Sequence, residues 1–366
     1  MRLTNIRGRR PKPGLQPQHL TAVKAAAAIS SATVTGAALD SQELTFAPAD
    51  VRACDYRFDI GTAGSTSLVL QTIYLPLALA STAGAGLLTV PPSEITPTAG
   101  AGLPTTPPSE ITLIGGTHVP WSPSFHYLDL QWRPYVVRLG LRIGLELELA
   151  GFYPQGNGQV QARIERVERI TGLHLTERGA LKGIHGISAV ANLDKSIAER
   201  QRAQAMRRLQ GRHNRLEIEL LDLPSRVKGT FLLLLAEFKH GSACYVGLGA
   251  PGKRAEQVAD EACLWLERFL ATNGALDEYL ADQLLLPLAF AEGPSELRTA
   301  KVTPHLLTNA EIIRAFGAAE IEIAGETGKP GLVRVRPATG DRRQGTGDRS
   351  QGSEVRGQGT GDRDGR

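Results

Sequence analysis

Cysteine is scarce in this chain, and its placement excludes several kinds of site. The 366 residues include only Cys54, Cys244 and Cys263, which lie far apart with no CxxC or Cys/His spacing. Cysteines placed in this way predict neither a disulfide framework nor a zinc site. Free thiols suit a reducing compartment, so we expect a cytoplasmic protein.

Long apolar runs are also missing. The longest extends from Leu68 to Ala80 and is interrupted by Gln71 and Pro76. It is shorter than the about 20 residues that a helix needs to span a bilayer. The basic start is followed by Pro11 and Pro13 instead of the apolar core of a signal peptide. The sequence therefore predicts no membrane association.

The excess of positive charge is small, and its location is more informative than its size. Lysine and arginine total 41 against 37 acidic residues, which gives a net charge of +4. This charge is compatible with an anionic partner but does not indicate one. The first twelve residues contain five basic side chains and no acid, namely Arg2, Arg7, Arg9, Arg10 and Lys12. The opening loop is therefore either a phosphate contact or a solvated basic terminus.

Apolar periodicity divides the chain into four parts. A hydrophobic share of 42% suffices for buried cores, and alternating helical and strand patterns predict an α/β (α+β) protein. The pattern changes after residue 176, and residues 177–252 resemble a self-contained small α/β unit. Residues 1–176 and 253–337 would then form the main domain. Residues 338–366 lack apolar periodicity and repeat Gly-Thr-Gly-Asp-Arg, which predicts a disordered tail.

A short duplication interrupts the first part. The segment Thr82 to Thr96 recurs as Thr98 to Thr112 and is rich in glycine and proline. Two copies are too few for a solenoid. We therefore predict a duplicated surface loop over residues 82–112, where added length costs little closure entropy.

One histidine has apolar neighbours. The stretch Thr303 to Asn309 is predicted to be a short apolar turn with His305 at its centre. On this local evidence alone, a histidine beside leucines is more often a satisfied core residue than a catalytic one.

A glycine and hydroxyl loop precedes a predicted helix. Gly61 to Ser67 leads into the helix predicted from Leu68 to Leu79. The loop is either an anion site with free backbone N–H groups or an ordinary strand-to-helix turn. It is not a Walker A loop, because no Gly-Lys-Ser/Thr follows. Gln71 lies about one turn into the helix and would point back at the loop.

A tryptophan lies in a proline-rich loop. His118 to Pro123 contains Trp121 between two prolines. Its indole would either stack on a nucleic-acid base or cap the core, and the second role is commoner.

Several separated blocks together resemble the RNA 3′-terminal phosphate cyclase family. The matching blocks are Arg7 to Val23, Asp55 to Thr72, Gly115 to Pro123, Gly151 to Gly158, Tyr279 to Pro287 and His305 to Asn309. The resemblance covers roughly Arg2 to Pro337 apart from the duplication. It implies a main domain of tandem βαβαββ repeats with a smaller inserted α/β domain.

The resemblance also implies a reaction, in which ATP drives conversion of an RNA 3′-terminal phosphate to a 2′,3′-cyclic phosphate. His305 would attack the α-phosphorus of ATP and carry AMP, which then passes to the RNA phosphate before the 2′-OH closes the ring. Mg²⁺ or Mn²⁺ would offset the triphosphate charge, with Asp282 a candidate ligand. The implied ATP pocket contains Gln71, Tyr279, Leu280, Ala281, Asp282 and Gln283. The implied contacts to the RNA terminal phosphate are Arg7, Arg10, Gln18 and His19.

Three departures from the family pattern support an alternative. The Gly-rich segment that the family places before Leu3 is absent, its triple-glycine turn is here Gly156-Asn157-Gly158, and the duplicated loop and the repetitive tail are foreign to the family. These departures favour a catalytically impaired or non-catalytic cyclase-like RNA-binding protein, whereas His305 favours the enzyme. A third hypothesis is an enolpyruvyl transferase, which shares the repeat architecture, but loops for a small phosphorylated acid are not found.

Overall fold

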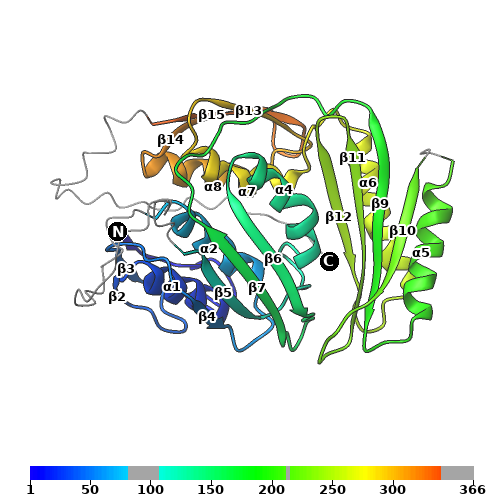
Figure 1. Cartoon of the computed structure of the whole chain (residues 1–366), viewed down its shortest axis with the longest axis horizontal. Coiled ribbons are helices and arrows are strands. Elements are labelled where there is room, and N and C mark those ends of the chain that lie inside the picture. The colour runs from blue at the N-terminus through cyan, green and yellow to red at the C-terminus, as the bar shows by residue number, and fades with distance from the viewer. Residues whose placement is uncertain (81–106, 212–214, 339–366) are drawn as a thin grey trace, which may run out of the picture.

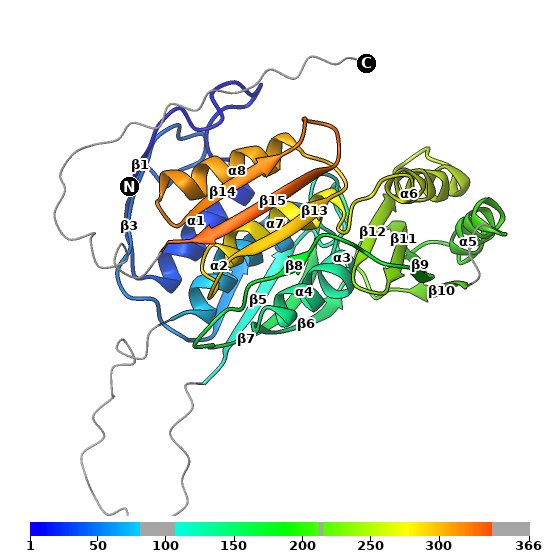
Figure 2. The same cartoon turned by 90° about the horizontal axis from the view of Figure 1, so that it is seen from above.

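The computed structural model describes residues 1–80, 107–211 and 215–338 (Figure 1). Most of the duplication and nearly all of the predicted disordered tail lie outside these residues. The described strands form four sheets. Figure 2 shows α2, α7 and α8 close together in the main body, with a second unit projecting to one side. No helix in the described parts is both long and apolar enough to cross a membrane.

A complete βαβαββ unit forms the middle of the main body. Its sheet has the order β4-β5-β7-β6, with β4 parallel to β5 and the other pairs antiparallel. Its elements are β4 (Tyr56–Asp59), α2 (Thr66–Ala78), β5 (Ser109–Gly115), a helical segment made of α3 (Phe125–Tyr127), η2 (Leu128–Trp132) and α4 (Arg133–Arg138), then β6 (Arg142–Leu149) and β7 (Gly158–Glu165).

A second unit repeats this topology. Its sheet has the order β8-β13-β15-β14, again with a parallel first pair followed by antiparallel pairs. The elements are β8 (His174–Leu175), α7 (Glu278–Leu288), β13 (Ser295–Thr299), α8 (Pro304–Ala315), β14 (Ala319–Ala324) and β15 (Gly331–Pro337). The prediction of tandem βαβαββ repeats is therefore confirmed.

The start of the chain contributes a partial unit. It consists of β1 (Arg2–Leu3), α1 (Pro17–Ile29), β2 (Thr33–Thr35) and β3 (Leu44–Ala47). The antiparallel sheet order β1-β3-β2 corresponds to β5-β7-β6 in the complete unit. In the complete unit, β5 corresponds to β1, and its other edge pairs in parallel with β4. No described strand takes the place of β4 beside β1.

A smaller α/β unit is inserted between β8 and α7, as predicted. Its sheet has the order β10-β9-β11-β12, and helices α5 and α6 cover one face (Figure 1). Helix α6 packs on α5, β11 and β12, so this covering layer continues beyond residue 252. The elements are β9 (Leu181–Ala191), α5 (Ser196–Leu209), β10 (Leu216–Asp222), β11 (Gly229–Phe238), β12 (Ser242–Leu248) and α6 (Ala255–Leu270).

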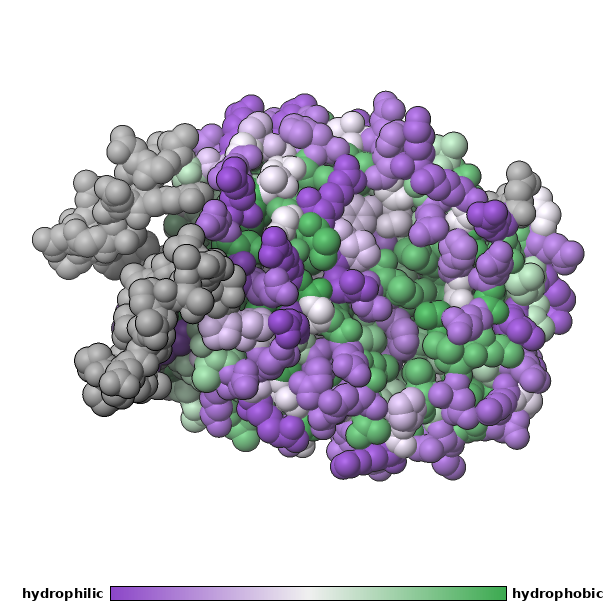
Figure 3. Space-filling model, in the orientation of Figure 1, coloured by the Kyte–Doolittle hydropathy of each residue, from purple (hydrophilic) through white to green (hydrophobic). Residues whose placement is uncertain are grey.

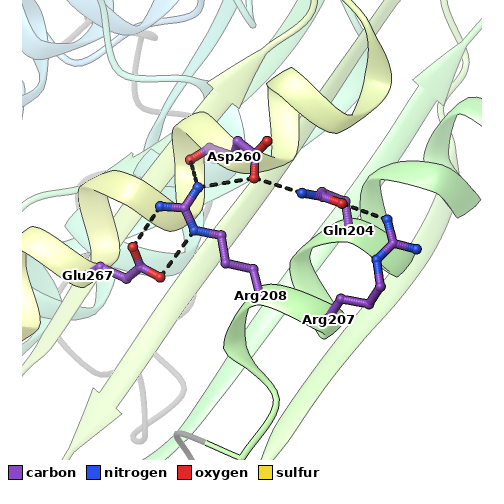
Figure 4. A network of polar contacts seen from close by, with 5 residues as sticks. All are labelled: Gln204, Arg207, Arg208, Asp260 and Glu267. Carbon is purple, nitrogen blue, oxygen red and sulfur yellow. Dashed lines mark hydrogen bonds and ion pairs between the residues drawn. The ribbon is translucent and has the colours of Figure 1, made fainter.

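Arg208 joins the two covering helices (Figure 4). Its guanidinium donates to both carboxylate oxygens of Glu267, at 2.7 and 3.1 Å, and to Asp260 at 3.1 Å. Gln204 adds a bond to Asp260, and Arg207 donates in turn to Gln204. The Arg208 side chain is only 26% exposed, so a planar bidentate contact is well shielded here. The network fixes α5 against α6 above their shared apolar layer.

The other face of the inserted sheet packs on the main body. Phe231 and Leu233 of β11 belong to the same buried cluster as Trp132 of η2. Figure 3 shows further apolar residues gathered on the visible face over this sheet. A groove between η2 and the sheet has Leu130 and Ile187 in its lining, with several acidic residues around it. The inserted unit is therefore packed against the body and not merely tethered to it.

The end of the predicted duplicated loop is a strand. Ser109 to Thr112 begin β5, which pairs with β4 on one side and β7 on the other. Ile111 lies between Tyr56 and Ala162 and is fully buried. The surface-loop prediction is thus wrong for these four residues. Their alternating pattern, Ser-Glu-Ile-Thr, is too short to indicate a strand when a proline-rich stretch directly precedes it.

Candidate active site

His305 lies in the first turn of α8, so the predicted short turn is wrong. The hydroxyl of Thr303 caps the helix by accepting from the Leu306 backbone N–H at 3.1 Å. Pro304 occupies the first helical position, where the missing N–H is harmless. Leu306 and Ala310 face the core, whereas the His305 side chain is exposed. The interpretation of His305 as a core residue is therefore wrong.

A carboxylate faces this histidine across the seam between α7 and α8. Asp282 of α7 is partly buried and accepts a hydrogen bond from the Asn309 amide. Burial raises the pKa of Asp282, while the Asn309 bond and the charge of nearby His305 oppose this effect. The three side chains form a polar cluster that opens to solvent at His305.

Helix α2 is joined to α7 by two carboxamides. Gln71 Nε2 donates to Gln283 Oε1 at 2.6 Å, and Gln283 Nε2 donates to the Tyr279 carbonyl at 3.0 Å. Gln71 therefore faces α7, where the sequence predicted that it would point at the preceding loop. The structure brings Gln71, Asp282, Gln283 and His305 onto neighbouring helices.

The remaining residues of the predicted ATP pocket differ in exposure. Leu280 and Ala281 are fully buried, so their side chains belong to the core and do not face solvent. Tyr279 is 47% exposed and packs edge-on against Tyr245 of β12, with ring centroids 6.3 Å apart. Tyr279 thus offers an accessible ring between the body and the inserted unit.

Asp277 organises the start of α7, and the sequence analysis missed it. Its carboxylate accepts five hydrogen bonds, three at one oxygen and two at the other. The donors are Tyr127 Oη (2.8 Å), Gln131 Nε2 (2.7 Å) and the backbone N–H groups of Cys244 (3.3 Å), Tyr279 (3.1 Å) and Leu280 (2.8 Å). Burial, together with adjacent Glu278, raises the pKa of Asp277 to about 7. An aspartate directly before a helical run is an N-cap signal, which was the available clue.

The basic opening loop is braced by its own arginine. Arg7 Nη1 donates to the carbonyls of Lys12 at 2.7 Å and Gly14 at 3.1 Å. Arg7 is partly buried, whereas Arg10 is exposed. The remaining N–H groups of Arg7 and the whole Arg10 guanidinium are available to an anion.

Gln18 and His19 lie at the start of α1 and also make contacts within the protein. Gln18 Oε1 accepts from the Ser65 backbone N–H at 2.7 Å, which links the starts of α1 and α2. His19 Nδ1 accepts from the Gln16 N–H at 3.3 Å. Burial, followed by the nearby Arg7 charge, lowers the pKa of His19. Through α2, this group is connected to the cluster around His305.

Several N–H groups of the glycine loop before α2 already bond within the protein. The Gly61 N–H donates to Asp59 at 2.8 Å, and the Gly64 N–H donates to the Thr62 hydroxyl at 3.2 Å. The next N–H, of Ser65, is bonded to Gln18 as described. The loop is built as a strand-to-helix turn in which these three amides bond within the protein, and the anion-site interpretation of the remaining amides stays a prediction.

The turn between β6 and β7 packs closely against this loop. Gly156 has a φ of +76°, and a Cβ there would lie 2.8 Å from the Ala63 Cα. Asn157 also adopts a left-handed conformation, with a φ of +56°. Asparagine tolerates this conformation better than other residues with a side chain. Its presence where the family has glycine is therefore compatible with the turn.

Two buried histidines lie where the body meets the inserted unit. His118 Nε2 and His126 Nδ1 are 2.8 Å apart, and His118 Nδ1 is 2.7 Å from the Thr117 hydroxyl. Both rings pack against Phe231 of β11, with centroid distances of 4.6 and 5.1 Å. Burial lowers the pKa of His126 to about 4, although Asp129 opposes the shift. The pKa of His118 is lowered as well, by burial and by His126.

Acid should weaken the protein through this pair. The pKa of His126 in the folded state is below its unfolded value of about 6.5, so the unfolded state binds the proton first as the pH falls. The free energy of unfolding is therefore unaffected above that pH and decreases as the pH falls toward 4. For His126 the loss is about 3 kcal/mol. We expect urea unfolding between pH 7 and 4 to show a smaller loss for His126→Gln than for the wild type. Parallel pH profiles for the two proteins would contradict this prediction.

The chain is similar to known proteins over most of its length. A family model described as RNA 3′-terminal phosphate cyclase matches residues 1–323. Curated proteins with that name are similar over most of their length. One from Methylococcus capsulatus is 39% identical over 92% of this chain and 88% of its own. Others are from Pseudomonas fluorescens, at 42% identity over 88% and 86%, and from Sulfolobus acidocaldarius, at 39% over 92% and 91%.

Proposed function

This chain belongs to the RNA 3′-terminal phosphate cyclase family, and we propose that it converts the 3′-terminal phosphate of RNA to a 2′,3′-cyclic phosphate with consumption of ATP. The observation that carries the proposal is the exposed His305, which stands beside Asp282 on the seam where α2, α7 and α8 meet. The reaction would make the protein a ligase that acts on RNA ends.

His305 would act as the nucleophile of the first step. A neutral ring nitrogen attacks the α-phosphorus of ATP, a P–N bond forms, and pyrophosphate leaves. Its place in the first turn of α8 supports this role, because the positive end of the helix favours phosphate oxygens there. The RNA phosphate oxygen then attacks the AMP phosphorus and releases His305. Finally the 2′-OH attacks the terminal phosphorus, and AMP leaves as the ring closes.

The residues of the seam fit a nucleotide with a divalent metal. No group of three or more histidine, cysteine, aspartate or glutamate side chains among the described residues could hold a metal ion alone. Mg²⁺ is commonly bound by one or two carboxylates together with substrate phosphates. Asp282 gives one oxygen to Asn309, which leaves the other for Mg²⁺ or Mn²⁺ or for a ribose hydroxyl. Tyr279 offers its exposed ring to the adenine, and Gln71 and Gln283 border the same pocket.

The opening loop would hold the RNA end. Arg10 is exposed, and Arg7 keeps N–H groups that its own loop does not use. The planar guanidinium suits bidentate binding of a phosphate. Gln18 and His19 stand at the start of α1 beside this loop, so they would define the side of the site on which the RNA phosphate lies.

The test is a reaction with a 3′-phosphorylated oligoribonucleotide, ATP and Mg²⁺. We expect an end that resists phosphatase and forms only with ATP. An oligonucleotide whose last sugar lacks the 2′-OH is the control, because it accepts AMP but cannot close the ring. RNA binding without any ATP-dependent product would instead identify a non-catalytic relative.

A further inference from the structure

Trp121 is fully exposed, which is unusual for the largest side chain. The residue is 100% accessible, whereas Trp132 in the same unit is fully buried. The interpretation of Trp121 as a core cap is therefore wrong. An indole that packs on none of the described residues presents a large apolar face to a partner outside the chain.

The backbone holds this ring in an uncommon conformation. Trp121 has a φ of +64°, a region that a bulky residue adopts only when its surroundings impose it. Its neighbours supply that constraint. Val119 is buried, Ser122 donates to the Val119 carbonyl at 3.3 Å, and prolines stand at 120 and 123. Strain of this kind is typical of binding loops.

Hydrogen bonds link the ends of this loop, which joins β5 to α3, to the starts of two helices that carry the proposed site. At one end the Gly116 N–H donates to the Gly64 carbonyl at 2.8 Å, just before α2. At the other end Tyr127 donates to Asp277, which caps α7. Trp121 is thus displayed on a loop tied to the starts of α2 and α7, the helices that bear Gln71 and Gln283.

We propose that Trp121 stacks on a base of the RNA strand, upstream of the nucleotide that carries the 3′-phosphate. This inference rests on the proposed function. A base presents a flat π-face to an exposed indole, and such stacking is strong and tolerant of sequence. The adenine of ATP is assigned to Tyr279, the exposed ring of α7. The favoured substrate is therefore a single-stranded RNA end several nucleotides long.

Binding of a 3′-phosphorylated hexaribonucleotide tests the inference without catalysis. Trp121→Ala should weaken binding about 10-fold or more, and Trp121→Phe should retain most of the affinity. Phe316→Ala is the matched control, since Phe316 is also an exposed aromatic residue (66%) but lies at the far end of α8 from His305. Because Trp121 makes no packing contacts, folding of the variants should be unaffected.

A series of oligonucleotides with one abasic sugar locates the base. Removal of the base that stacks on Trp121 should weaken binding of the oligonucleotide to the wild type. The same removal should not further weaken binding to Trp121→Ala. The inference is overturned if Trp121→Ala binds every oligonucleotide as the wild type does, or if it loses affinity for ATP alone. Trp121-dependent binding without cyclic product would instead overturn the proposed function and leave this inference standing.

Discussion

Replacing His305 with alanine is expected to abolish the covalent AMP adduct and to lower RNA cyclisation at least about 10⁴-fold, as loss of a nucleophile does in other enzymes. In the proposed reaction, the His305 imidazole is the only protein group that forms a bond to AMP. His305 is exposed, and the substitution should change the free energy of unfolding by no more than about 0.5 kcal/mol.

The measurement is a labelling reaction with ATP that is radioactive at the α-phosphorus. The wild type should give an acid-labile labelled band, and His305→Ala should give none. Glu311→Ala is the control, because Glu311 is exposed on the same helix without belonging to the cluster. A labelled band that persists in His305→Ala would place the nucleophile elsewhere.

Replacing Asp277 with alanine should lower the free energy of unfolding by about 3–5 kcal/mol. The substitution removes the acceptor of five hydrogen bonds, four of them buried, and the cap of α7. Asp277→Asn should be less severe. One side-chain oxygen would still accept, but the new amide would face the donors Gln131 and Cys244.

Urea unfolding of the full chain measures this effect. Asp194→Ala is the control, since Asp194 accepts from the Ser196 N–H at the start of α5 but is exposed. Loss of such an exposed hydrogen bond should lower the free energy of unfolding far less than loss of Asp277 does. If the two alanine variants were equally stable, the five-donor network around Asp277 would not stabilise the fold as argued.

The sequence predicted local elements better than the contacts between them. The helix predicted from Leu68 to Leu79 is observed as α2 (Thr66–Ala78), because its apolar run is a local signal. The contact between Gln71 and Gln283 joins residues 212 positions apart, and Tyr127 lies 150 positions from Asp277. No periodicity encodes such pairs. The family resemblance predicted which blocks belong to the site, whereas their partners came only from the fold.

The errors at His305 and Trp121 have related physical causes. Apolar neighbours suggested that His305 is buried, but they occupy the other face of a helix that the sequence analysis read as a turn. Of the histidines in the described parts of the chain, His118 and His126 are buried, in segments where no apolar stripe indicated it. Trp121 was assigned to the core by frequency alone. Exposure depends on which face of an element meets the body, and that is a property of the assembled fold.

The position of the inserted unit has a consequence for synthesis of the chain. Leu173, beside β8, bonds to Ser295 at the start of β13, 122 positions later. At about 5–20 residues per second, β8 waits roughly 6 to 24 seconds for its partner strand to be made. The inserted unit is translated within that interval and can fold first. The seam that holds His305 is therefore assembled last, against a neighbour that already has its structure.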